Sequence, residues 1–309
     1  MGAGLTGVGA VGVLLHQRDA DDAATPRTAT SRVVDTRAPE APEAPDLAVV
    51  RGSDAAAATR RAVEALGGMG RFVRSGEKVL VKPNIAWDRL PAHGANTNPT
   101  VVAEVVRMCV AAGAAKVVVT DVSCNEARRS FERSGIWRAA QDAGAQVVLP
   151  DPSVYEEFDL RGVLGRWRIL RQVVEADRLI NVPVVKHHGL SRLTAGMKNW
   201  YGVLLDDRRH RLHQVIDEGI ADLAATFRPA LTVLDATLVM VRNGPQGGGM
   251  SDVERRDLVA ATTDPVAGDA WAASLLGREP EEVPYIGLAE RAGLGRSRPP
   301  AARRIEITL

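Results

Sequence analysis

The hydrophobic residues of this chain follow two recurring patterns along most of its length. Short runs of β-branched and aliphatic residues predict buried strands at residues 47–52, 78–87, 116–123 and 145–151. Between them, apolar residues spaced three and four apart predict helices at 55–68, at 96–114 after an initial loop, and at 127–145 with a break at Gly135. This β-α-β-α-β order predicts parallel strands joined by right-handed crossovers.

The same alternation continues through the second half of the chain. Further strands are expected at residues 166–176, 179–186, 230–241, 257–264 and 304–309. Further helices are expected at 210–227, 264–277 and 284–295, and a glycine-rich loop at 243–249. We therefore predict an α/β domain over residues 48–309, with a mostly parallel mixed sheet and helices on both faces.

Residues 1–47 lack this pattern and are expected to precede the domain. Residues 2–15 form an apolar run that is too short for a transmembrane helix but typical of the apolar core of an export signal. Residues 17–47 are polar and rich in proline and alanine, which predicts a linker. If the leader is a truncated signal, the domain is exported, and the linker joins the domain either to that signal or to an N-terminal membrane tether; if the leader has no targeting role, the protein is cytoplasmic.

Composition excludes several classes of function. The hydrophobic fraction of 45% is that of a globular protein with a sizeable core. A net charge of +1 and an aromatic fraction of 4% argue against a nucleic-acid-binding surface. With only Cys109 and Cys124 present, the chain cannot hold a cysteine-only iron–sulfur cluster, and a disulfide between them cannot be inferred. Cys109 lies in an apolar helical pattern and is expected to be buried.

Candidate chemistry is concentrated in residues 187–202, HHGLSRLTAGMKNWYG, directly after the predicted strand 179–186. Four of the six histidines lie between residues 187 and 213, and α/β folds build sites at the carboxyl ends of buried strands. Imidazole suits acid–base catalysis and also binds transition metals. We therefore predict His188 and Lys198 as catalytic, Asn199 as substrate-binding, and His188 with His213 as metal ligands. His187 should point to the opposite face and pack. A purely structural role is the alternative for each histidine.

Other predicted strand ends carry groups that could join this site. Lys82 and Asn84 are carried at the carboxyl end of the predicted strand 78–87, and Asn98 lies at the start of a predicted helix, so their amine and amide groups could bind a carboxylate or phosphate. Asp235 lies in an apolar strand and is a candidate catalytic carboxylate. The alternative is that these residues cap turns and helices. The glycine-rich loop lacks the features of a nucleotide-binding loop.

Several motifs occur along the chain in a defined order: KPNI, NTNPTVVAEVV, INVPVVKHH, TAGMKNWYG, VLDA, GPQGGG and TDPVAGDAWAASLLG. Over residues 48–280 this series resembles the domain of unknown function 362 family. The resemblance implies a bacterial or archaeal origin; many members carry a twin-arginine export signal, and some carry a ferredoxin-like cluster domain. This chain has neither a twin arginine before its apolar run nor a CxxCxxC series.

A more distant similarity concerns the spacing of His188, Lys198 and His213. It is similar to the lactate racemase family, in which a histidine, a lysine and a later histidine surround a nickel-pincer nucleotide. By that analogy His188 would be an acid–base group, Lys198 the attachment point of the cofactor and His213 a metal ligand.

The sequence thus predicts an enzyme, an oxidoreductase or an isomerase, that acts on a small anionic substrate, a carboxylate or a phosphate. The predicted chemistry is proton or hydride transfer next to a carbonyl group, with a divalent transition metal as a candidate cofactor. Two alternatives stay open. One is a racemase or epimerase with a nickel-pincer-type cofactor, and the other is a non-catalytic exported protein that binds a metabolite.

Overall fold

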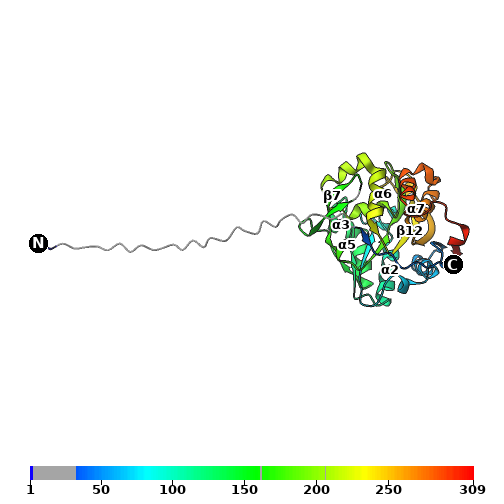
Figure 1. The fold of residues 1–309 in the computed structure, drawn as a ribbon, viewed down its shortest axis with the longest axis horizontal. Helices are drawn as coiled ribbons and strands as arrows, with labels where there is room; N and C mark the ends of the chain where they lie inside the picture. Colours follow the sequence, from blue (N-terminus) through cyan, green and yellow to red (C-terminus); the bar gives the residue numbers. More distant parts are fainter. Residues whose placement is uncertain (3–32, 161, 206) are drawn as a thin grey trace.

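The computed structural model describes residues 1–2, 33–160, 162–205 and 207–309 (Figure 1). The predicted leader falls almost entirely in residues 3–32 and so lies outside the described residues. Across the described ranges, no helix has the length and apolar character needed to cross a membrane.

One large sheet organises the domain. Its main path runs β14 (Arg304–Thr308), β2 (Leu47–Arg51), β13 (Val253–Thr262), β12 (Leu231–Met240), β8 (Arg178–Val182), β3 (Lys78–Pro83), β4 (Lys116–Val119) and β5 (Gln146–Val147). Neighbours pair in parallel except that β13 is antiparallel to both β2 and β12. The predicted α/β fold with a mostly parallel mixed sheet is confirmed.

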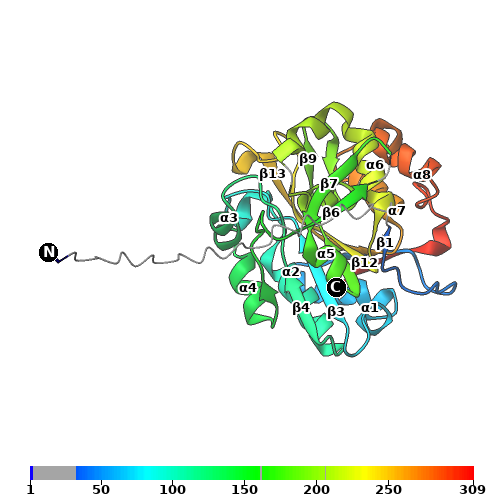
Figure 2. The same cartoon turned by 60° about the vertical axis from the view of Figure 1, so that its left-hand side comes forward.

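Helices cover both faces of this sheet (Figure 2). Along β3, Val79 and Val81 point into one core and Leu80 into the other, because side chains alternate along a strand. The first core is closed by α1 (Ala55–Ala65), α2 (Pro99–Ala111) and α4 (Ile136–Asp142), and the second by α6 (Ile216–Thr226), α7 (Pro265–Ser274) and α8 (Pro284–Arg291). Strands buried on both faces are predominantly apolar, which is why the sequence shows them as largely hydrophobic runs.

Some predicted elements differ from those observed. The helix expected at 127–145 is divided at Gly135 as predicted, into α3 (Ala127–Arg133) and α4. The strand expected at 166–176 is wrong in its second half, since β7 (Gly165–Leu170) leads into the short helix α5 (Arg171–Glu175). β7 pairs with β6 (Tyr155–Leu160) in a separate two-stranded sheet. The helix expected at 210–227 begins only at Ile216, after the mostly polar 3-10 segment η4 (Asp207–Val215).

Part of the predicted linker belongs to the folded domain. β1 (Val34–Asp35) pairs in parallel with β11 (Phe227–Arg228), and Thr36 is buried beside them. The Thr36 hydroxyl donates to Arg228 O and accepts from Leu179 N, which ties this segment to the start of β8. The folded region therefore begins ahead of residue 48.

The predicted strand 179–186 is two strands that separate at Pro183. β8 remains inside the sheet, whereas β9 (Val184–His188) pairs with β12 and, in antiparallel fashion, with β10 (Arg192–Thr194). Proline has no amide hydrogen to donate, which suits the point where the ladder is interrupted. Because the chain leaves β8 at Pro183 and continues as β9, Lys186 and His188 lie where the parallel strands of the sheet have their carboxyl ends.

Candidate functional site

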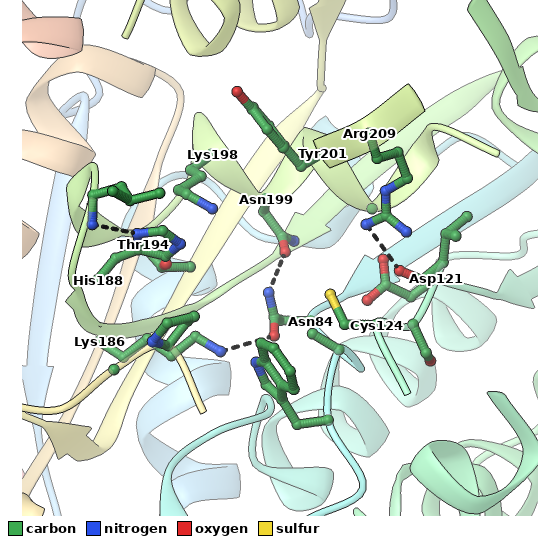
Figure 3. A pocket seen from close by; sticks show the side chains of 18 of the residues that line it. Asn84, Asp121, Cys124, Lys186, His188, Thr194, Lys198, Asn199, Tyr201 and Arg209 are labelled. Atoms are coloured by element: carbon green, nitrogen blue, oxygen red, sulfur yellow. Dashed lines mark hydrogen bonds between the residues drawn. The ribbon is translucent and has the colours of Figure 1, made fainter. Parts of the chain in front are cut away.

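A cavity of about 550 Å³ lies at the carboxyl ends of β3, β4 and β9 (Figure 3). Its walls come from the loops after β3 and β4, from β9 and β10, and from the 3-10 helix η3 (Lys198–Val203). Its polar lining includes Asn84, Asp121, Lys186, His188, Lys198, Asn199, Arg209 and His213. The structure thus brings five of the predicted site residues, Asn84, His188, Lys198, Asn199 and His213, to one cavity.

Two carboxamides occupy the centre of this wall. Asn84 Nδ2 donates to Asn199 Oδ1 at 3.1 Å, and Asn199 Nδ2 donates to Asn181 Oδ1 at 2.9 Å and to Lys82 O at 3.1 Å. On its other side, Asn84 Oδ1 accepts from Lys186 Nζ at 3.2 Å. Because Asn84, Asn199 and Asn181 are all hydrogen-bonded in this network, the orientations of their amides are set by their partners. The network holds the Lys186 amine in a defined position.

Lys82 lies behind the wall, in an ion pair with Asp121. Lys82 Nζ is 2.6 Å from Asp121 Oδ1 and also donates to Pro83 O, while Asp121 Oδ2 accepts from Ile85 N at 2.6 Å. Burial lowers the pKa of Lys82 and raises the pKa of Asp121, and the ion pair opposes both shifts. The prediction that Lys82 binds substrate directly is not supported by this placement. Lys82 instead holds Asp121 and the turn after β3.

Lys186 is the functional candidate that the sequence prediction missed. In β9 it lies two positions before His188, so the two side chains share a face. Its amine donates to Asn84 Oδ1 and to Ala95 O. Burial, together with the charge of Lys198, lowers the pKa of Lys186 to about 7. The small number of lysines could have pointed to Lys186 from the sequence. The chain has only five, and three of them, Lys82, Lys186 and Lys198, lie at this site.

Lys198 opens η3 and faces the same cavity. Its Nζ lies 4.8 Å from the centre of the Tyr201 ring, and it has no hydrogen-bond acceptor or carboxylate partner among the described residues. Burial lowers the pKa of Lys198 to about 8. A minor but substantial fraction of the amine is therefore neutral near physiological pH.

The loop that carries Lys198 is anchored by a buried carboxylate. Asp269 of α7 accepts from Gly196 N at 2.7 Å, from Met197 N at 3.1 Å and from the Tyr285 hydroxyl at 3.1 Å. Burial raises the pKa of Asp269 to about 7, against these three hydrogen bonds. Asp269 thus positions Lys198 from outside the cavity.

His188 presents one ring nitrogen to the cavity. Its Nδ1 accepts from Leu190 N and Ser191 N, both at 3.2 Å, so the proton of the neutral ring lies on Nε2. Burial, followed by the charges of Lys198 and Lys186, lowers the pKa of His188 to about 2. His188 is therefore a neutral imidazole that donates through Nε2, and it is too weak a base to take a proton near neutral pH. His187 lies on the other side of β9, where its Nδ1 accepts from Gly244 N.

Two predicted site residues lie away from the cavity. Asp235 is inside β12, where its carboxylate accepts from Asn98 N at 2.7 Å and from the amide and hydroxyl of Thr237. Asn98 caps α2 by accepting from Thr100 N at 2.9 Å. Neither residue lines the cavity. The predictions of a catalytic Asp235 and a substrate-binding Asn98 are therefore replaced by structural roles, because their polar atoms are used in joining α2 to β12.

Comparison with known proteins identifies the family to which this chain belongs. The profile described as Domain of unknown function (DUF362) matches residues 79–274, more than half of the chain. This chain belongs to the DUF362 family. It is 29% identical over 255 residues to the thylakoid-associated protein sll1697 of Synechocystis, a match that covers 77% of this chain and 75% of that protein. The structure of the lactate racemase apoprotein from Thermoanaerobacterium thermosaccharolyticum matches with a TM-score of 0.38 and 15% identity, over 74% of this chain and 56% of that chain.

The metal that the sequence prediction allowed does not fit the donors of this DUF362 domain. Within the described ranges, no group of three or more histidine, cysteine, aspartate or glutamate side chains could hold a metal ion. At His188, Nδ1 is occupied by two backbone donors, which leaves Nε2 alone. Cys109 is buried and Cys124 exposed, and both thiols are free.

A substitution at Gly202 tests how tightly the site of this DUF362 domain is packed. A Cβ at Gly202 would lie 1.9 Å from Asp121 Oδ1 and 2.6 Å from Lys82 Nζ. Gly202→Ala is therefore expected to lower the free energy of unfolding by about 1–3 kcal/mol, as overpacking of cores does. Denaturant titration measures this, with Gly70→Ala as the control because no atom lies within 4 Å of its added Cβ. Equal losses in both variants would contradict the packing described.

Proposed function

We propose that this protein is an enzyme that binds a small carboxylate or phosphate in the cavity and moves a proton at the carbon next to a carbonyl group. The observation that carries the proposal is the pair of amines, the buried Lys186 and the half-buried Lys198, that line one cavity. Arg209 adds a third basic side chain to the wall. Asp121 is the single carboxylate among the described lining residues, and it is paired with Lys82. Such a lining favours an anionic ligand.

Lys186 has the properties of a general base. A group is most effective in this role when its pKa lies near the working pH, and burial brings the pKa of Lys186 to about 7. In the neutral amine, the two N–H groups can donate to Asn84 Oδ1 and Ala95 O, so the lone pair remains for a proton from the substrate.

Two neutral donors supplement the basic groups. His188 Nε2–H can donate to a carbonyl oxygen and stabilise the negative charge that develops there when a proton leaves the neighbouring carbon. Thr194 also lines the cavity, and its buried hydroxyl has no hydrogen-bond partner among the described residues. A substrate oxygen would satisfy that hydroxyl, and buried polar groups are rarely left unsatisfied.

Proton exchange with solvent tests the proposal. The protein would be incubated in D₂O with 2-hydroxy acids, 2-oxo acids and their phosphorylated analogues, and loss of the proton signal next to the carbonyl or carboxylate would be followed by NMR. Exchange above the protein-free rate for at least one acid is expected. Saturable binding of these acids without exchange would instead support the non-catalytic metabolite-binding alternative.

The exchange rate is expected to rise with pH through about 7. Lys186 must lose its proton to act as a base, and burial with the charge of Lys198 lowers the pKa of Lys186 to about 7. The deprotonated fraction, and with it the rate, therefore increases as the pH passes that value. A pH series of initial exchange rates measures this. A rate that falls as the pH rises would argue that a protonated acid, and not Lys186, limits the reaction.

A further inference from the structure

We propose that Lys198 is a nucleophile that forms an imine with the carbonyl carbon of a 2-oxo acid. This inference rests on the proposed function, since it names the substrate class of the same cavity and gives it a covalent step. It separates the roles of the two amines: Lys186 moves the proton and Lys198 holds the substrate.

The three lysines at the site differ in what they contact. Lys82 is ion-paired with Asp121, and Lys186 donates to Asn84 Oδ1 and Ala95 O. Lys198 contacts the face of the Tyr201 ring and has neither acceptor nor counter-ion in the described part of the chain. Attack on a carbon requires a neutral amine that can move up to the carbonyl carbon. The ion pair with Asp121 keeps Lys82 charged, and two acceptors hold Lys186 in place, so Lys198 meets this condition best of the three amines.

The surroundings of Lys198 favour its neutral form. The wall carries Lys186 and Arg209, and its one carboxylate among the described residues is paired with Lys82. Desolvation in a site with other basic groups is a known way to activate a lysine for attack on a carbonyl. The lowered pKa of Lys198, about 8 because of burial, is consistent with this geometry. The same basic groups would bind the carboxylate of a 2-oxo acid.

The covalent step balances without any further reactant. The Lys198 ammonium first loses a proton to solvent, and the Nζ lone pair then forms a C–N bond to the carbonyl carbon while the carbonyl π electrons move to the oxygen. One N–H proton of the attacking nitrogen passes to that oxygen to give a neutral carbinolamine, and Thr194 Oγ1 and His188 Nε2 can donate hydrogen bonds to the oxygen during this step. A proton returned from solvent then joins the oxygen, the nitrogen lone pair forms the C=N bond, the C–O bond breaks, and the oxygen leaves as water. The product is a protonated imine that keeps the positive charge of the former ammonium and draws electrons from the adjacent C–H bond.

Borohydride trapping tests this inference. The full chain would be incubated with pyruvate as the probe and treated with borohydride, then examined by intact mass and peptide mapping. We expect one adduct, with the mass of pyruvate less one oxygen atom, on Lys198. Lactate, which has a hydroxyl in place of the ketone and so cannot form an imine, should give none. An adduct spread over the surface lysines Lys78 and Lys116, or no adduct at all, would overturn the inference.

Matched variants separate this inference from the proposed function. Lys198→Met should lose the adduct, while Lys116→Met, at an exposed position, should keep it. Lys186→Met should keep the adduct and lose exchange. If wild-type protein exchanges the probe's protons but is never trapped, the imine is wrong and the proposed function stands. If it is trapped on Lys198 without exchange, the imine stands and proton transfer is wrong.

Discussion

Replacing Lys186 by methionine is expected to lower the rate of proton exchange by about 10²–10⁴-fold, the usual contribution of a general base. Methionine has nearly the same length but no lone pair that can accept the proton. The measurement is the initial exchange rate in D₂O by NMR at a saturating concentration of the acid. Since Asn84 Oδ1 and Ala95 O each lose a donor, some loss of thermal stability accompanies the change.

Two further variants make this result specific. Lys186→Arg keeps the positive charge but cannot deprotonate, and so it should be as inactive as Lys186→Met. Lys116→Met removes an exposed lysine from the start of β4 and should exchange at the wild-type rate. If folded Lys186→Met, identified by a cooperative melting transition, retained most of the wild-type rate, Lys186 would not be the base.

Breaking the buried ion pair is expected to have the largest effect on stability. Lys82 and Asp121 are both almost completely buried, and removing one partner leaves the other charge without compensation. Lys82→Met or Asp121→Asn should each lower the free energy of unfolding by about 3–5 kcal/mol. Denaturant titration with a two-state fit gives both values.

The double variant is the control for charge. Lys82→Met combined with Asp121→Asn removes both charges, and the asparagine oxygen can still accept from Ile85 N. Its loss should therefore be well below the sum of the two single losses, because the pair interacts directly. Losses that simply add would show that each residue acts through its own contacts and that the ion pair contributes little.

The fold could be predicted from the sequence because its strands are buried on both faces. Predominantly apolar runs, such as Val79–Val81 within β3 and most of Leu231–Met240, follow from that burial, and the helices between the strands show apolar stripes. β6 escaped prediction because it pairs only with β7 outside the main sheet, so its residues, YEEFDL, carry no such run.

The site could be predicted in part. His188 and Lys198 could be predicted as site residues because both lie close to the end of one strand. The contact between Asn84 and Asn199 could not be predicted, because it joins positions 115 residues apart and depends on how β3 and η3 meet. Asp235 was wrongly predicted to line the cavity. A polar residue in an apolar strand gives the same sequence pattern whether its side chain faces a cavity or the end of a helix. Lys186 was overlooked, although its spacing from His188 places both on one face.

The most direct measurement is an NMR titration of the lysine side chains in protein labelled with ¹³C-lysine. Five lysines give few signals, and the Lys186 and Lys198 variants assign theirs. Because burial lowers the pKa values of Lys186 and Lys198, we expect their signals to titrate near pH 7 and pH 8. Addition of an anionic acid should raise both midpoints, since a bound anion favours the charged amines. If both lysines stayed charged up to about pH 10, where ordinary lysines titrate, neither could serve as base or nucleophile near neutral pH, and the account would be contradicted.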